Sequence, residues 1–240
     1  MFRPIEIPGQ AEIRNRGRKN FCRGKMENLD DIRDFFKKCF AEHGETAEGV
    51  GWNSSFAQEV RFDQLLKVIP AAGTPFTFLE FGCGYGHLVS YMRSKGIHPV
   101  HYYGYDIVPE SILTAREHFR NDPQVSFHET LEEIPQTDYL CASGVFNIKL
   151  DTDYAAWTDH ILQSLQRFDR HTTGGFSVNF LTKYSDTDRM AARPDLYYAD
   201  PCFLFDYCKT NFSRNVALLH DYEIYDFTLI VRKGSPGSVA

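Results

Sequence analysis

The stretch Phe78–His87, FLEFGCGYGH, decides the fold of this 240-residue chain. It reads as an apolar strand with an acid near its end, three glycines at alternate positions, and then a helix. Glycines let the chain turn tightly, so that backbone N–H groups can approach a ligand closely. The stretch therefore predicts a ligand-binding loop between a strand and the helix that follows it.

The phase of the glycines indicates which ligand the loop binds. The dinucleotide fingerprint needs its third glycine where this chain has His87, and Gly86 comes one residue too early. The loop therefore fits a nicotinamide nucleotide poorly. The segment Glu80–Gly86, EFGCGYG, instead resembles motif I of the class I S-adenosylmethionine-dependent methyltransferases.

The composition, with 42% hydrophobic and 24% charged residues, is that of an ordinary globular protein. No apolar run reaches the roughly 18–20 residues of a membrane span, and the N-terminus lacks the apolar region of a signal peptide. The six cysteines show no CxxC spacing, so we expect neither a metal site nor a disulfide framework. We predict a cytoplasmic protein with no membrane partner.

Positive charge is concentrated at the N-terminus. Residues 1–25 carry a net charge of +5 in a chain of net charge −6, which leaves −11 for the remainder. This segment is either an arm for an anionic surface or a solvated tail. Because the acidic remainder offers no continuous path for a phosphate backbone, a nucleic-acid substrate is disfavoured.

Strands and helices alternate through most of the chain. The expected strands are 76–81, 100–105, 125–128, 138–143 and 174–180. The expected helices between them are 86–94, 109–119 and 154–168. This alternation predicts an α/β fold, a parallel sheet with helices on both faces. After a helix at 201–212, strands at 215–222 and 224–231 are joined so directly that they must form an antiparallel hairpin.

A Rossmann-like, seven-stranded, mostly parallel sheet closed by an antiparallel hairpin strand is the hallmark of the class I methyltransferases, so the topology adds to the resemblance. The resemblance covers roughly residues 54–233. Helices expected at 28–42 and 54–69 precede the sheet. We therefore assign residues 1–25 to a basic tail, 26–70 to an N-terminal helical cap and 71–240 to the methyltransferase domain.

Ligands of open parallel sheets bind beyond the carboxyl ends of the strands. The resemblance implies that Gly82 and Gly84 lie against the methionine part of S-adenosylmethionine and that Glu80 holds its ammonium group. Cys83 and Gly86 belong to the same predicted cofactor loop.

Asp106 follows the second expected strand, where a carboxylate can accept hydrogen bonds from both hydroxyls of a ribose. In the resembled family an acid here binds the ribose, and the next residue, Ile107, packs on the adenine. Dinucleotide folds also carry an acid at this spacing, so Asp106 indicates a nucleoside rather than one particular cofactor. The alternative role for Asp106 is to cap the following helix.

Further candidates follow the third and fourth strands. By resemblance, Glu129 is the candidate for the adenine amino group, and Ser143 is a further candidate cofactor contact. The amide N-methyltransferases of nucleic acids and proteins carry an Asn/Asp-Pro-Pro-aromatic motif here, and this chain lacks both prolines. Methylation of bases is therefore disfavoured, and Asn147 is left as a substrate contact. Arg61 either pairs with the cofactor carboxylate or faces solvent.

The segment Thr182–Tyr198 shows no apolar periodicity, and long irregular segments of compact domains are often functional. Asp186 and Tyr198 are therefore catalytic candidates alongside Asn147. The side chains expected to line a substrate pocket are Tyr184, Asp186, Arg189, Tyr197 and Tyr198. No residue stands out as a catalytic base. Among the nine histidines, we expect His160 and His171 at the surface.

These observations predict a methyltransferase that uses S-adenosylmethionine and acts on an oxygen or nitrogen of a small molecule, with sugar-like or natural-product acceptors favoured. The sulfonium makes the methyl group electrophilic, so the protein has mainly to align the reactants. The alternatives are a non-catalytic protein that binds a nucleoside cofactor and a nicotinamide-dependent oxidoreductase. A homodimer remains open.

Overall fold

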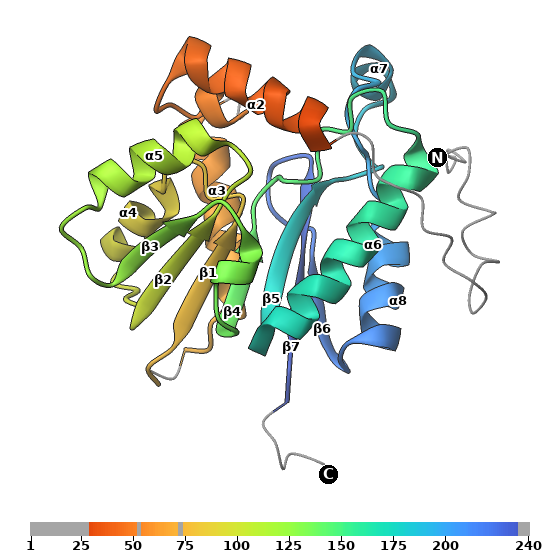
Figure 1. The fold of residues 1–240 in the computed structure, drawn as a ribbon. Helices are drawn as coiled ribbons and strands as arrows, with labels where there is room; N and C mark the ends of the chain where they lie inside the picture. Colours follow the sequence, from red (N-terminus) through yellow and green to blue (C-terminus); the bar gives the residue numbers. More distant parts are fainter. Residues whose placement is uncertain (1–28, 52–53, 72–73, 235–240) are drawn as a thin grey trace.

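The computed structural model describes residues 29–51, 54–71 and 74–234, which contain one seven-stranded sheet (Figure 1). Its order is β3-β2-β1-β4-β5-β7-β6. The strands are β1 (Thr77–Phe81), β2 (His101–Tyr105), β3 (Val125–His128), β4 (Thr137–Ala142), β5 (Thr172–Leu181), β6 (Asn215–Leu219) and β7 (Asp226–Arg232). All pairs from β3 to β5 are parallel, and β7 runs antiparallel to both β5 and β6. The predicted sheet with its antiparallel hairpin strand is confirmed.

Helices cover both faces of this sheet (Figure 1). The α-helices are α2 (Leu29–His43), α3 (Ser55–Leu65), α4 (His87–Ser94), α5 (Pro109–His118), α6 (Tyr154–His171), α7 (Thr187–Ala192) and α8 (Pro201–Asn211). Three short 3-10 turns are η1 (Glu48–Val50), η2 (Leu66–Val68) and η3 (Leu131–Glu133). Apolar residues of α3, α4 and α5 pack on one face, and those of α6 and α8 pack on the other. Among the described residues, no helix combines the length and apolar character of a membrane span.

Local capping explains where several helices begin. Ser54 accepts a hydrogen bond from the backbone N–H of Ala57 at the start of α3. Asp153 and Asp200 do the same for the first N–H groups of α6 and α8. Each cap satisfies donors that have no partner within the helix. Helices α6 and α8 begin at Tyr154 and Pro201, as predicted, because an aspartate directly before each of them caps its first turn.

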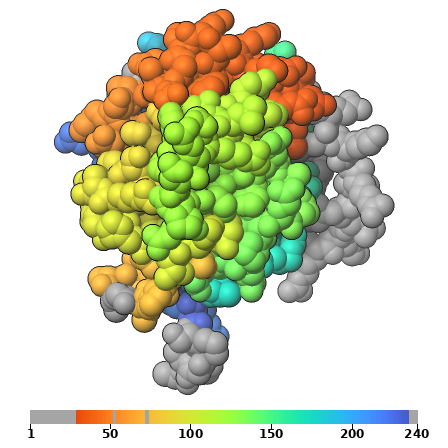
Figure 2. All heavy atoms as spheres, turned by 60° about the vertical axis from the view of Figure 1, so that its left-hand side comes forward, coloured from red at the N-terminus to blue at the C-terminus, as the bar shows by residue number. Residues whose placement is uncertain are grey.

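The two N-terminal helices have different positions. Helix α2 crosses the top of the molecule and rests on α5, as Figure 2 shows, with an ion pair between Lys37 and Glu110. Helix α3 instead packs against β5 and β7, and the Ser177 hydroxyl donates to the carbonyl of Leu65 at 2.8 Å. Of these two helices, α2 is the one that covers the carboxyl ends of the strands. The predicted basic tail lies outside the described residues.

Two expectations about irregular segments are wrong. The stretch after β5 contains the helix α7, which is too short for an apolar period to show in the sequence. Strand β6 ends at Leu219, so six residues separate it from β7 instead of the nearly direct junction that we expected. The hairpin pairing survives because Leu219 still pairs with Thr228.

Strand β5 contains a glycine that no other residue can replace without a backbone shift. Gly175 has φ +145°, and a Cβ there would lie 2.2 Å from the carbonyl oxygen of Val231 in β7. Gly96, at the end of α4, has φ +72° but open space around its Cβ position. Both replacements strain the backbone, but only that of Gly175 also forces two strands apart.

We therefore expect Gly175→Ala to lower the free energy of unfolding by about 3 kcal/mol or more, since strain and overpacking add. Gly96→Ala is the matched control and should cost only about 1–2 kcal/mol. Urea denaturation followed by circular dichroism measures both values. Equal losses for the two variants would contradict the described packing of β5 on β7.

Candidate active site

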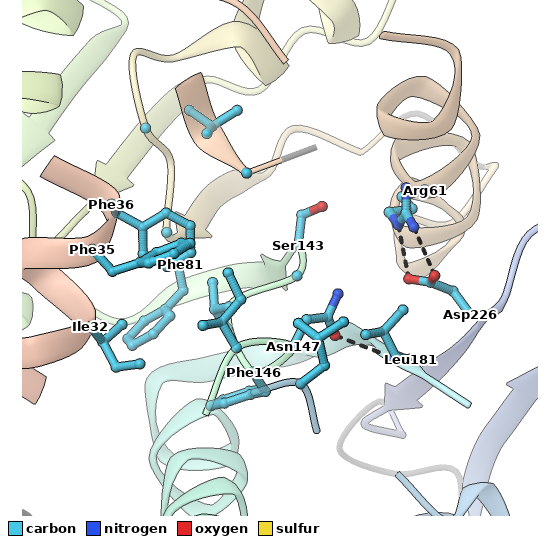
Figure 3. A pocket seen from close by; sticks show the side chains of 18 of the residues that line it. Ile32, Phe35, Phe36, Arg61, Phe81, Ser143, Phe146, Asn147, Leu181 and Asp226 are labelled. Atoms are coloured by element: carbon cyan, nitrogen blue, oxygen red, sulfur yellow. Dashed lines mark hydrogen bonds and ion pairs between the residues drawn. The ribbon is translucent and has the colours of Figure 1, made fainter. Parts of the chain in front are cut away.

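A cavity of about 550 Å³ lies at the carboxyl ends of β1, β2 and β4, beneath α2 (Figure 3). Loop residues after these strands line one side, and the apolar side chains Ile32, Phe35 and Phe36 of α2 line another. Volumes of roughly 300–1,000 Å³ are typical of small-molecule and cofactor sites. The cavity is thus large enough for a nucleoside cofactor and the reacting part of a second molecule.

The glycine loop after β1 forms part of the cavity wall. The backbone N–H groups of Gly82 and Cys83 donate to the carbonyl of Tyr105 at 2.7 and 2.9 Å, which ties the loop to the end of β2. Gly82 and Gly84 line the cavity, both with positive φ. A Cβ on Gly82 would lie 2.3 Å from Val145 Cγ1, so a side chain here would collide with the loop after β4. Gly86 instead faces aromatic rings of the core.

Asp106 stands directly after β2 and lines the cavity, with 9% of its surface exposed. Its Oδ2 accepts from the N–H of Gly84 at 2.8 Å, and its Oδ1 accepts from the N–H of Val108 at 2.9 Å. Burial raises the pKa of this carboxyl, while the backbone donors oppose the rise. Because each carboxylate oxygen has two lone pairs, Asp106 can hold the loop and α5 and still accept bonds from a ribose.

Glu80 and Glu129 lie outside the cavity lining. Glu80 is 3% exposed and accepts a hydrogen bond from the hydroxyl of Tyr102. Burial raises the pKa of Glu80 to about 8. Glu129 is exposed and forms an ion pair with Arg116 at 3.1 Å. The predicted contacts of Glu80 with the cofactor ammonium and of Glu129 with the adenine remain predictions, as do those of Cys83 and Gly86, which also lie outside the lining.

The loop after β4 supplies polar groups. The N–H of Gly144 donates to Asn179 Oδ1 at 2.8 Å. Ser143 Oγ is buried beside the cavity and has no hydrogen-bond partner among the described residues. Asn147 Oδ1 accepts from the N–H of Leu181 at 3.1 Å, which fixes the orientation of the amide. Its amino group therefore points into the cavity as a donor (Figure 3).

Helix α6 contributes His160, Ser164 and Arg167 to the lining, which the sequence prediction missed. Burial, and then the charge of Arg167, lower the pKa of His160 to about 4, so this imidazole is neutral at pH 7. The expectation of a surface position is wrong for His160, which lines the cavity, whereas His171 is half-buried outside the lining. The spacing of His160, Ser164 and Arg167 places them on one helical face, but the sequence does not show that this face borders the cavity.

Only some of the residues after β5 that we expected to line a substrate pocket do so. Arg189 and Tyr198 line it. Tyr197 does not: it is 2% exposed and stacks on Tyr154 in the core, with ring centroids 4.6 Å apart. Tyr184 is exposed, and Asp186 accepts from the hydroxyl of Tyr225 outside the lining. The prediction that all five residues line the pocket is therefore wrong for three of them.

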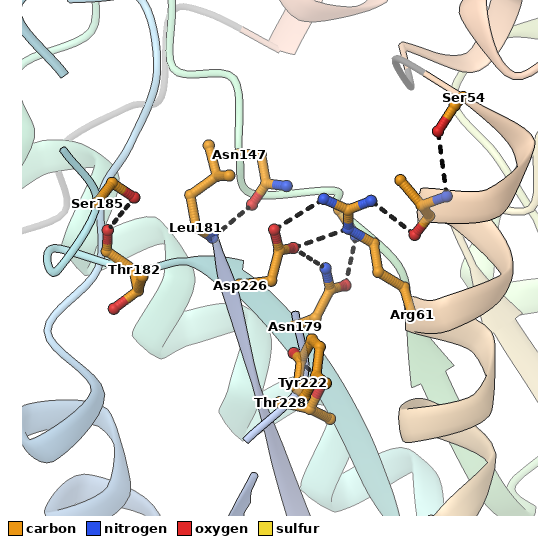
Figure 4. A network of polar contacts seen from close by, with 12 residues as sticks. Ser54, Arg61, Asn147, Asn179, Leu181, Thr182, Ser185, Tyr222, Asp226 and Thr228 are labelled. Carbon is orange, nitrogen blue, oxygen red and sulfur yellow. Dashed lines mark hydrogen bonds and ion pairs between the residues drawn. The ribbon is translucent and has the colours of Figure 1, made fainter. Parts of the chain in front are cut away.

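Arg61 pairs with a carboxylate of the chain itself (Figure 4). Its Nε and Nη2 donate to the two oxygens of Asp226 at 2.8 and 2.7 Å, and Nη1 donates to the carbonyl of Ala57 at 2.7 Å. Asn179 Nδ2 donates to Asp226 Oδ2 at 2.7 Å. Both members of the ion pair line the cavity. The alternative in which Arg61 faces solvent is wrong, and its contact with a cofactor carboxylate remains a prediction.

These groups fit S-adenosylmethionine. Gly82 and Gly84 bring the backbone of the loop to the cavity wall, and Asp106 offers carboxylate oxygens beside them. Ile107 and Val145 add apolar surface suited to an adenine, and the buried Ser143 hydroxyl, which has no partner among the described residues, is a further polar group of the lining.

The high pKa of Glu80 makes stability depend on pH. Its pKa is about 8 in the folded protein against an ordinary value of 4.5, so its contribution to the free energy of unfolding is complete below about pH 4.5 and declines as the pH rises through 8. Between pH 5 and pH 8, the free energy of unfolding of wild type should therefore fall by on the order of a few kcal/mol relative to that of Glu80→Gln. Denaturation of the ligand-free protein across this range measures the difference. Glu117→Gln, on the exposed face of α5, should follow wild type; parallel profiles for wild type and Glu80→Gln would refute the burial argument.

Known proteins resemble this chain in sequence. A family model described as "Methyltransferase domain" matches residues 79–171. The chain is 42% identical over 170 residues to "Putative methyltransferase Rv1506c" of Mycobacterium tuberculosis (strain ATCC 25618 / H37Rv), covering 71% of this chain and 100% of that protein.

Solved structures share the fold. The N-methyltransferase NodS from Bradyrhizobium japonicum WM9, in complex with S-adenosylhomocysteine, gives a TM-score of 0.60 at 13% identity, over 86% of this chain and 100% of that one. Human N-acetylserotonin methyltransferase, in complex with S-adenosylmethionine, gives a TM-score of 0.57 at 16% identity, over 83% of this chain and 59% of that one. Cofactor, fold and sequence agree: the chain belongs to the class I S-adenosylmethionine-dependent methyltransferases.

Proposed function

We propose that this protein transfers a methyl group from S-adenosylmethionine to an oxygen or nitrogen of a small molecule, with sugar-like or natural-product acceptors favoured. One observation carries the proposal. The cavity extends without a break from the glycine loop and Asp106, past Asn147, to Tyr198. One end suits the cofactor, and the other leaves room for an acceptor under the cover of α2.

The bound cofactor supplies a methyl group that its sulfonium has already made electrophilic. The chain then has to hold the acceptor in line with that group. The amino group of Asn147 is a donor that can orient the acceptor. Phe35 and Phe36 of α2 exclude water from the same space.

The carboxylates of the cavity leave the choice between oxygen and nitrogen open. A hydroxyl acceptor must lose its proton to a base, whereas an amine that binds in its neutral form needs none. Asp226 is held by Arg61, and Asp106 accepts two backbone hydrogen bonds. One structural relative is named for a small acceptor, N-acetylserotonin, which supports a small-molecule acceptor here. A cytoplasmic location, a homodimer, the exclusion of nucleic acid and the domain boundaries remain predictions from the sequence.

Methyl transfer tests the proposal directly. Incubation with isotopically labelled S-adenosylmethionine and a panel of hydroxylated and aminated small molecules should label at least one of them. Asn147→Asp keeps the oxygen that accepts from Leu181 and replaces the donor that faces the cavity. For the labelled acceptor, kcat/KM should fall about tenfold or more, as expected for one lost hydrogen bond, while cofactor affinity changes little.

Asn121→Asp, at an exposed site between α5 and β3, is the control for the change from amide to carboxylate. An unchanged kcat/KM in Asn147→Asp would remove Asn147 from the acceptor site. If the cofactor binds and no molecule is ever labelled, the non-catalytic alternative replaces the proposed function.

A further inference from the structure

Tyr198 belongs to the cavity wall, and its buried hydroxyl is unpartnered among the described residues. The residue is 8% exposed and lines the cavity, and its hydroxyl oxygen is buried without a hydrogen-bond partner among the described residues. Buried tyrosine hydroxyls normally have a partner, because leaving one unpaired costs free energy. A group of a bound molecule is the partner that this hydroxyl lacks.

Hydrogen bonds hold the backbone on both sides of Tyr198 and so fix the position of its Cα. The hydroxyl of Tyr154 donates to the carbonyl of Tyr198 at 3.1 Å. On either side, the N–H of Tyr197 donates to the carbonyl of Asn147 at 2.9 Å, and the N–H of Ala199 donates to the carbonyl of Leu181 at 2.8 Å. The main chain that carries the tyrosine is therefore held in place without a ligand.

Charged side chains of both signs lie near this hydroxyl. Burial raises the pKa of Tyr198, the charges of Arg189 and Arg193, which also line the cavity, act against that rise, and the charge of Asp195 adds to it. Arg193 is held by both oxygens of Asp195, at 2.9 and 2.7 Å. Arg189 instead lies over the ring of Tyr225, at 4.7 Å from its centroid. Within the described ranges, no carboxylate lies at ion-pair distance from Arg189.

Asp195 balances Arg193, so Arg189 is the one of these two arginines without an ion-pair partner among the described residues. Asp226 is neutralised by Arg61, and Asp106 lies at the opposite end, beside the glycine loop. Glu223, an exposed residue, is the remaining carboxylate of the lining. The acceptor end of the cavity therefore favours an anion.

We propose that the methyl acceptor carries an anionic group, a carboxylate or a phosphate, which binds between the Tyr198 hydroxyl and the Arg189 guanidinium. A guanidinium and a phenolic donor together suit an oxyanion, since charge-assisted hydrogen bonds are short and strong. The inference rests on the proposed function and narrows its acceptor to a class of acidic small molecules.

The test uses the full chain saturated with S-adenosylhomocysteine, titrated with benzoate and with its neutral analogue benzamide. Ligand-observed NMR gives both dissociation constants, and inorganic phosphate is added as a competitor. We expect benzoate to bind at least about tenfold more tightly than benzamide. Displacement of benzoate by phosphate would show that the subsite accepts either oxyanion, whereas no displacement would restrict it to carboxylates.

Two variants locate the anion. Tyr198→Phe removes only the hydroxyl, and Arg189→Gln removes the charge. Each should weaken benzoate binding about tenfold and change the affinity for S-adenosylhomocysteine less than twofold. Arg214→Gln, at an exposed position outside the cavity, controls for the loss of one positive charge.

Three results would overturn the inference. The first is that neither benzoate nor phosphate binds more tightly than benzamide. The second is that both variants bind benzoate as tightly as wild type does. The third is that Arg189→Gln weakens the binding of S-adenosylhomocysteine and not that of benzoate, which would assign this arginine to the cofactor. A protein that binds no S-adenosylhomocysteine at all would instead contradict the proposed function, so the two failures are distinguishable.

Discussion

The fully buried carboxylate of Asp226 is the constraint on which the shape of the cavity depends. Burying a charge costs several kcal/mol unless it is paired and hydrogen-bonded. Two bonds from Arg61 and one from Asn179 meet that requirement, and Asn179 in turn accepts the N–H of Gly144 (Figure 4). One ion pair thus connects α3, β7, β5 and the loop after β4. Removing either charge would leave the other buried and unpaired, and the cavity wall would shift with it.

The two ends of the cavity have opposite electrostatic character. The end beside the glycine loop presents the carboxylate of Asp106, whose oxygens suit the hydroxyls of a nucleoside. The other end presents Arg189 and the unpartnered hydroxyl of Tyr198. The cofactor and an anionic acceptor would therefore each bind at the end of the cavity whose charge suits them, before the two are aligned. Alignment is what the reaction mainly requires of the protein.

The sequence predicted what local patterns determine and missed what depends on distant contacts. Strand β3 has the expected bounds, and the glycine loop and Asp106 lie at the cavity as expected. The partner of Arg61 lies 165 residues away in sequence, so no local pattern could reveal it. His160 was expected at the surface because nothing in the sequence tells which helical face borders a cavity. Helix α7 was missed because its six residues are too few to show the helical repeat of apolar side chains.

Calorimetric titration of S-adenosylhomocysteine into wild type and Asp106→Asn tests most directly whether this cavity is the methyl-donor site. Asp106→Asn keeps the shape of the side chain and replaces one acceptor oxygen by a donor. The account predicts that wild type binds S-adenosylhomocysteine in preference to NAD, and that the variant binds it about tenfold or more weakly. Asp221→Asn, at an exposed position, should bind as wild type does. Unchanged affinity in Asp106→Asn, or a preference for NAD, would contradict it.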